Sequence, residues 1–104
     1  MRHREEAERE ARERARREQE EAEARAKYLD TLVGRDEDIW ARVKVLIEAK
    51  KAAEYDQAIQ CLKDLRDLSV RSGKTELFSA RVAELRALNP GKQALLKRMD
   101  TVGL

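Results

Sequence analysis

The chain has 104 residues, of which 42% are charged and 4% aromatic, and its 23 basic and 21 acidic residues leave a formal net charge of +2. This length allows one small domain with an extension, and so even a charge balance weakens the expectation of the basic face typical of nucleic-acid-binding proteins. One cysteine, Cys61, and one histidine, His3, exclude an internal disulfide and cannot complete a four-ligand zinc site within one chain.

The pattern of hydrophobicity does not indicate a membrane-spanning segment or a targeting segment. No apolar run approaches the roughly 18 residues that cross a bilayer. The charged N-terminal segment lacks the apolar stretch of a secretory signal, and its acidic residues argue against a transit peptide. We therefore expect a cytoplasmic protein that does not enter a membrane.

Residues 1–27 form the first segment, in which nine basic and nine acidic residues occur and no large apolar residue follows Met1. Strong helix formers dominate it, and acids precede bases by four residues, a spacing that stabilises a helix. These pairs are Glu5–Arg9, Glu8–Arg12, Glu10–Arg14, Glu13–Arg17, Glu21–Arg25 and Glu23–Lys27. Only alanine fills the inner positions, which disfavours a coiled coil. The segment predicts a solvated single helix that continues to Gly34 and acts as an arm of about 40 Å, at about 1.5 Å per residue.

Four further helices are predicted after residue 28. The second helix is predicted to begin at Asp36, which can cap it, and to end at Lys50 and Lys51, with one apolar stripe along its length. After a short connection at residues 52–54, a third helix covers 55–72, with Gly73 as its stop. Thr75 is the predicted cap of a helix over 75–88, and Asn89-Pro90 the predicted start of the last one. No strand-like alternation occurs. The prediction is an all-α fold: residues 28–104 form a bundle of about four helices, and residues 1–27 a charged extension.

Residues 35–72 resemble a tetratricopeptide hairpin. Tyr55, Ala58, Leu62 and Leu65 repeat the pattern of the second helix of such a unit. Because a solenoid needs about three stacked repeats and no 34-residue period follows Gly73, we expect one hairpin of this shape within a small bundle.

Residues 28–104 also resemble the C-terminal helical region of bacterial, especially actinobacterial, SWIM zinc-finger proteins. The resemblance rests on Asp38–Ile47, Tyr55–Leu68 and Phe78–Leu88, and on the closing order of two leucines, two basic residues, a hydrophobic residue and an aspartate at 95–100. It implies an accessory helical region with a weak link to nucleic acid. The C-x-C and C-x-H zinc-binding element of that family is missing here, so no zinc ligand carries over, and we expect no metal or other cofactor.

Catalytic chemistry has few candidates. His3 lies in the solvated segment, Asp64 and Asp67 are expected on an exposed helix face, and no glycine-rich phosphate loop is present. Cys61 lies mid-helix beside an apolar stripe, where core packing is favoured over a reactive thiol. We expect a protein that is not an enzyme.

Two binding hypotheses remain, and the first is a protein-interaction or scaffold module. Its candidate contacts are Trp40, Tyr55 and Leu62, although Trp40 and Tyr55 also suit a core. The alternative is a nucleic-acid-binding or regulatory accessory domain, with phosphate contacts from Lys92, Lys97 and Arg98. A third expectation, compatible with either, is that the chain is a fragment of a longer zinc-finger protein. The face of the fourth helix with Leu77, Val82 and Leu88 is covered either by the last helix or by a second copy, and the sequence leaves both alternatives open.

Overall fold

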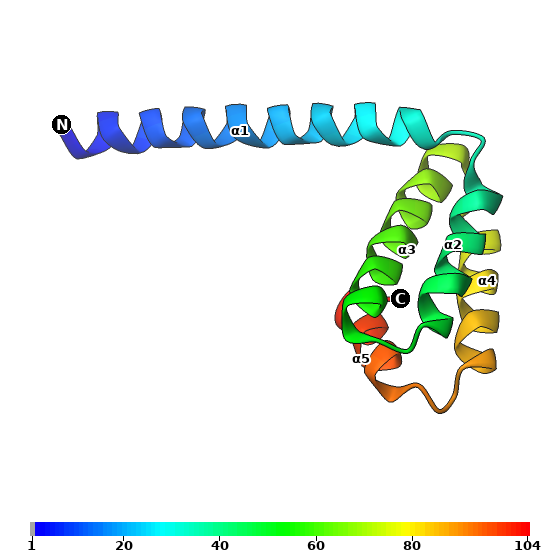
Figure 1. Ribbon diagram of the computed structural model, residues 1–104. Helices are drawn as coiled ribbons and strands as arrows, with labels where there is room; N and C mark the ends of the chain where they lie inside the picture. The colour runs from blue at the N-terminus through cyan, green and yellow to red at the C-terminus, as the bar shows by residue number, and fades with distance from the viewer. Residues whose placement is uncertain (1) are drawn as a thin grey trace. The chain divides into compact units, whose positions relative to one another are not determined.

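The computed structural model describes residues 2–104, and over these residues the protein consists of five helices and no strands (Figure 1). The prediction of an all-α fold with a small helical bundle is confirmed. The chain divides into two compact units, Met1–Leu32 and Val33–Leu104. The likeness of one hairpin to a tetratricopeptide unit stays a prediction.

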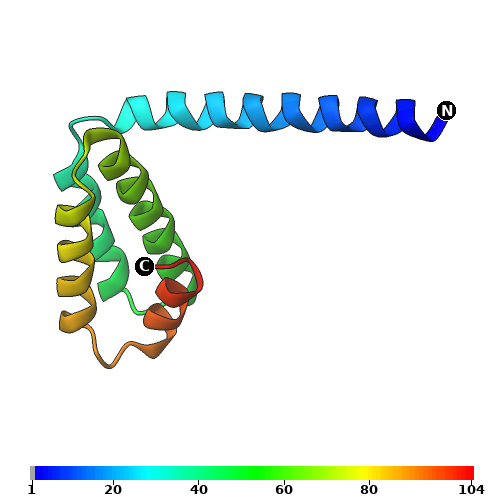
Figure 2. The same ribbon diagram turned by 180° about the vertical axis from the view of Figure 1, so that it is seen from behind.

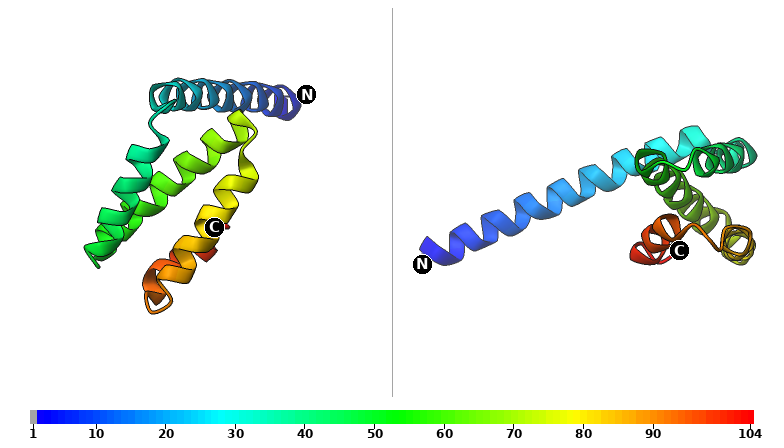
Figure 3. Two further views of the ribbon diagram at one scale, coloured as in Figure 1. Left: turned by 90° about the vertical axis from the view of Figure 1, so that its right-hand side faces the viewer. Right: turned by 60° about the horizontal axis from the view of Figure 1, so that its bottom comes forward.

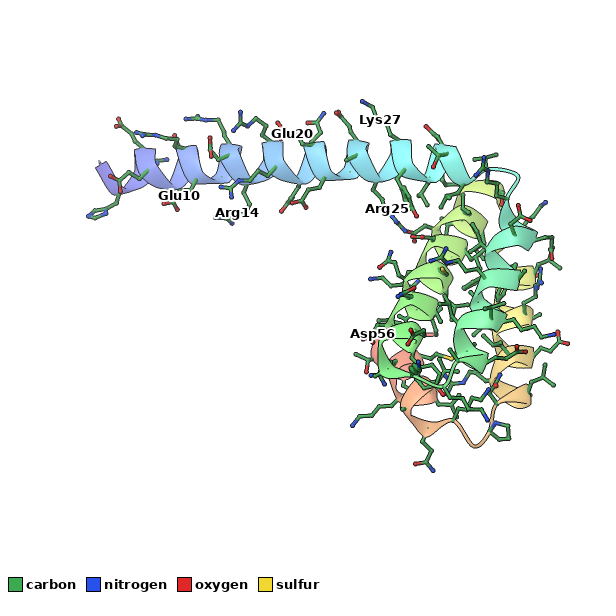
Figure 4. The ribbon with its side chains drawn as sticks, in the orientation of Figure 1. Glu10, Arg14, Glu20, Arg25, Lys27 and Asp56 are labelled. Carbon is green, nitrogen blue, oxygen red and sulfur yellow. The ribbon has the colours of Figure 1, made fainter. Side chains whose placement is uncertain are left out.

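The first unit is a single helix, α1, over Arg2–Leu32. From His3 to Ala24 every side chain is exposed, as the absence of large apolar residues predicts. Charged side chains project on both sides of the helix, for example Glu10 and Glu20 in Figure 4. Glu13 pairs with Arg17 at 3.7 Å and with Arg16 at 3.1 Å. Such exposed pairs contribute only about 0.2–0.5 kcal/mol each, so α1 depends on many of them and on high helix propensity.

The second unit begins with an antiparallel hairpin of α2, Asp36–Glu48, and α3, Ala52–Ser72. These two helices share the most extensive interface in the unit. Val43 of α2 and Ala58 and Leu62 of α3 are completely buried in the core.

The turn between α2 and α3 corrects two predictions. Residues 52–54 form the first turn of α3, not a connection, and Lys50 and Lys51 lie beyond the end of α2. Lys50 has a φ of +56° and Lys51 is extended, so these two residues reverse the chain. At the other end of α3, Gly73 ends the helix in the left-handed region with a φ of +68°, as predicted.

The last two helices are α4, Thr75–Leu88, and α5, Gln93–Thr101. The predicted caps are wrong, because Arg35, Lys74 and Lys92 precede α2, α4 and α5, and none of the three makes a side-chain capping bond. Asn89 does not start α5, since its side-chain amide donates to the carbonyl of Leu85 at 2.8 Å and closes α4 instead.

Helix α3 is the centre of the second unit, because α2, α4 and α5 each pack against it. Figures 2 and 3 show α5 beside the N-terminal half of α3, and Figure 1 shows α2 and α4 running in the same direction. The core cluster consists of Val43, Leu46, Ile47, Tyr55, Ala58, Ile59, Leu62, Leu65, Phe78, Val82, Leu95 and Met99. Side chains of α2, α3 and α4 line a hollow between α2 and α4.

Candidate functional site

A groove of about 850 Å³ lies between α2 and α4, and Trp40 of α2 is central to it. Leu65 and Leu68 of α3 and Phe78 of α4 supply apolar surface to its lining. A second hollow of about 560 Å³ continues between the same two helices and shares Trp40 with the first. Together the two hollows form what we call the Trp40 groove.

Trp40 is held between two side chains of α4. Its ring centroid is 6.0 Å from that of Phe78, with the rings tilted by 40°. Arg81 Cζ lies 4.4 Å from the centroid of the Trp40 ring, within the range of a cation–π interaction. Trp40 is half-buried, so the indole contributes both to the core and to the groove surface.

Arg81 also forms an ion pair across the groove with Glu37 of α2. Arg81 Nη1 donates to Glu37 Oε1 at 2.6 Å, and Nη2 donates to Oε2 at 3.3 Å. This two-pronged geometry is the strongest form of an arginine–carboxylate contact. The pair fixes α2 against α4 at the level of Trp40, although Glu37 remains mostly exposed.

Arg81 changes the acidity of Glu37. The hydrogen bonds from Arg81 lower the pKa of the Glu37 carboxyl, loss of water raises the pKa by a smaller amount, and the charge of Arg81 lowers it again. A depressed folded-state pKa means that the pair stabilises the fold above the unfolded-state pKa of Glu37, and that this stabilisation disappears as the pH falls through the folded-state pKa.

We predict that an NMR titration of the Glu37 carboxyl carbon gives a pKa below the ordinary glutamate value in the natural chain. In Arg81→Ala, that pKa rises to the ordinary value, because the donor that stabilises the carboxylate is missing. Arg42→Ala is the control, since Arg42 does not contribute to the pKa shift of Glu37 and its removal leaves the titration unchanged. An equal pKa in the natural chain and Arg81→Ala contradicts the assignment.

The three predicted protein-contact residues separate in the structure. Trp40 lines the groove. Tyr55 is 7% exposed and Leu62 is not exposed at all, because both belong to the core. The expectation that Tyr55 and Leu62 contact a partner is therefore wrong, since neither presents its side chain at the surface.

The predicted phosphate contacts lie in and just before α5, and two of them donate hydrogen bonds to other side chains of the same chain. Arg98 Nε donates to Asp56 Oδ1 at 2.8 Å, and its Cζ lies 6.0 Å from the centroid of the Tyr55 ring; Figure 4 labels Asp56 at the start of α3. Lys92 Nζ donates to Asn89 Oδ1 at 2.8 Å. Lys97 is exposed. Nucleic-acid binding by these residues stays a prediction, with Lys97 the most accessible of the three.

The candidates for catalysis lie apart from the groove lining. Cys61 packs at the core edge, as predicted, and burial raises the pKa of its thiol, an effect that nearby Arg42 partly offsets and Asp64 reinforces. Asp64 is 4% exposed and accepts a hydrogen bond from Gln60 Nε2 at 3.2 Å, so the expectation of a solvated Asp64 is wrong. His3 is exposed on α1.

Comparison with protein-family models, curated proteins and solved structures gave no match to this chain. The resemblance to SWIM zinc-finger proteins therefore stays a prediction. Over residues 2–104, no three histidine, cysteine or acidic side chains are grouped so that they can hold a metal ion. None of the helices over these residues has an apolar stretch long enough to cross a membrane.

Sequence reasoning missed Arg81 and Phe78 as parts of the site. Phe78 lies within a helix that the sequence predicts over 75–88, and Arg81 is one of many charged residues. Both become recognisable only through Trp40, from which they are separated by about forty residues along the chain. The exposed leucines of α4 were noted in the sequence: Leu77 and Leu88 are exposed, whereas Val82 is buried in the core.

Proposed function

We propose that this chain is a non-enzymatic protein-interaction module and that its partner binds in the Trp40 groove. The observation that carries the proposal is the half-buried Trp40, stacked under Arg81 in a groove with an apolar lining. Tryptophan and arginine are the residues most often responsible for binding energy at protein interfaces. Charged residues at the rim, such as Glu37 and Glu84, complete the usual anatomy of an interface.

Exposed leucines support the same surface. Leu77 is 66% exposed and Leu88 is 73% exposed, and each lines one of the two hollows of the Trp40 groove. Covering such side chains contributes about 25 cal/mol per Å² of apolar area removed from water. A partner that covers both leucines and the indole therefore gains affinity from side chains that the folded monomer leaves exposed.

Capture by the immobilised full chain tests this function. Leu77→Asp and Leu88→Asp place charges in the groove and are expected to reduce the amount of captured protein about ten-fold or more, because a charge buried at an interface without a partner is costly. Val45→Asp is the matched control, since Val45 is 66% exposed on α2 and lines neither hollow. Equal capture by all three variants and the natural chain removes the proposal.

The resemblance to SWIM zinc-finger proteins gives the module a proposed context. We propose that it is the accessory helical region of a protein of that kind, in which the zinc-binding element lies on another part of the sequence. The supporting observation is the helix pattern of residues 28–104. Reading the coding sequence upstream for a C-x-C and C-x-H element tests it.

A further inference from the structure

One surface of α4 carries a pattern that is symmetric about its own centre. We call it the α4 stripe: Leu77, Ala80, Arg81, Glu84 and Leu88, all of which line the Trp40 groove. All five residues are exposed. Leu77 and Leu88 are eleven residues apart, about three helical turns, and so lie on one face. The stripe thus places a leucine at each end and an opposite-charge pair between them.

From this symmetry we propose that a second copy of the chain covers the Trp40 groove, with α4 packed antiparallel against α4 of the second copy. This rests on the proposed function and names the partner. In the register centred between Val82 and Ala83, Leu77 meets Leu88 of the second copy and Arg81 meets Glu84 of the second copy. Because the contact is two-fold, each of these pairs forms twice.

An antiparallel pairing of α2 with α2 of the second copy also brings opposite charges together. Centred between Trp40 and Ala41, an antiparallel α2 pair brings Glu37 opposite Lys44 of the second copy, and both residues are exposed and line the groove. The two centres lie within about one helical turn of each other, because Arg81 reaches the Trp40 ring at 4.4 Å. Since α2 and α4 run in the same direction (Figure 1), one two-fold axis across both helices satisfies the two pairings together.

Other occupants fit this surface less well. The α4 stripe has one basic and one acidic residue, so it offers no net charge to a nucleic acid. Residues 2–27 of α1 carry no large apolar side chain and have nothing to place against Leu77 and Leu88. A second copy supplies a leucine opposite each leucine of the α4 stripe and an opposite charge opposite each of its two charges.

Cross-linking of the full chain tests the register. In a Cys61→Ala background, Leu77→Cys combined with Leu88→Cys is expected to give a disulfide-linked dimer under mild oxidation. Each single variant is expected to stay unlinked, because its two cysteines lie about 16 Å apart along the antiparallel helices, whereas a disulfide needs Cα atoms less than about 7 Å apart. Failure of the double variant to cross-link, or equal linking by the single variants, overturns the register.

Sedimentation equilibrium tests the dimer itself. The natural chain is expected to be dimeric at micromolar concentration, and Glu84→Arg, which opposes Arg81 of the second copy, is expected to weaken dimerisation about ten-fold or more. Circular dichroism checks that each variant is folded. A monomeric natural chain overturns the dimer. In that case, loss of captured proteins by Leu77→Asp still supports the interaction function, and unchanged capture removes both proposals.

Discussion

Replacing Leu62 by alanine is expected to lower the free energy of unfolding of the Val33–Leu104 unit by about 2–5 kcal/mol. Leu62 is completely buried near the middle of α3, the helix on which α2, α4 and α5 all pack. The substitution removes apolar contacts and leaves a cavity that the neighbouring helices only partly fill. Small domains are stable by about 5–15 kcal/mol, so the loss is a large share of the total.

Urea unfolding followed by the fluorescence of Trp40 measures this loss. Trp40 is the one tryptophan of the chain and lies in the second unit, so the helical signal of α1 does not contribute. Val70→Ala is the matched control, because Val70 is also on α3 but is 63% exposed, and a surface substitution changes stability by about 0.5 kcal/mol or less. Equal losses in Leu62→Ala and Val70→Ala contradict the assignment of Leu62 to the core.

Sequence periodicity predicted the helices well because burial selects the apolar residues of each one. On α3, Ala58, Leu62 and Leu65 recur at helical spacing and all three are buried. Over residues 2–27 of α1 the same argument works in reverse, since a segment without large apolar residues cannot bury a face. Helix type and approximate extent therefore follow from the order of residues alone.

The helix starts were harder to predict because the residues before α2, α4 and α5 make no side-chain capping bond. Asn89 followed by Pro90 has the pattern of a helix start. In the structure, the Asn89 amide instead satisfies a free carbonyl at the end of α4, so the chain passes Pro90 and Gly91 before α5 begins at Gln93. Both uses of asparagine are common, and the choice depends on where α5 must lie to bury its apolar face.

The site was predictable in part. Trp40 was a candidate partner contact, although its place on an apolar stripe favoured the core, and the structure gives it both roles. Arg81 could not be identified in the same way, because its role depends on the placement of α4 beside α2. Nothing in the sequence distinguishes Arg81, which stacks on the indole, from the other basic residues among the 23 of the chain.

Replacing Leu95 by alanine is expected to detach α5 from the bundle and to cost about 2–5 kcal/mol of stability. Helix α5 has nine residues, too few for an isolated helix to be stable in water. Its burial rests on Leu95 and Met99, neither of which is exposed. Without Leu95, half of this apolar anchor is lost.

Polar contacts alone are not expected to hold α5 after this change. Arg66 donates to the carbonyl of Val102 at 2.7 Å, and Arg86 pairs with Asp100 at 2.8 Å, but Asp100 is exposed, and exposed pairs contribute at most about 1 kcal/mol. Amide hydrogen exchange measures the outcome. Leu95→Ala is expected to speed exchange throughout α5 more than within α2 and α3, whereas Lys97→Ala, at an exposed position of the same helix, leaves it unchanged. Uniform exchange in all helices of Leu95→Ala would instead mean that α5 unfolds only with the whole unit.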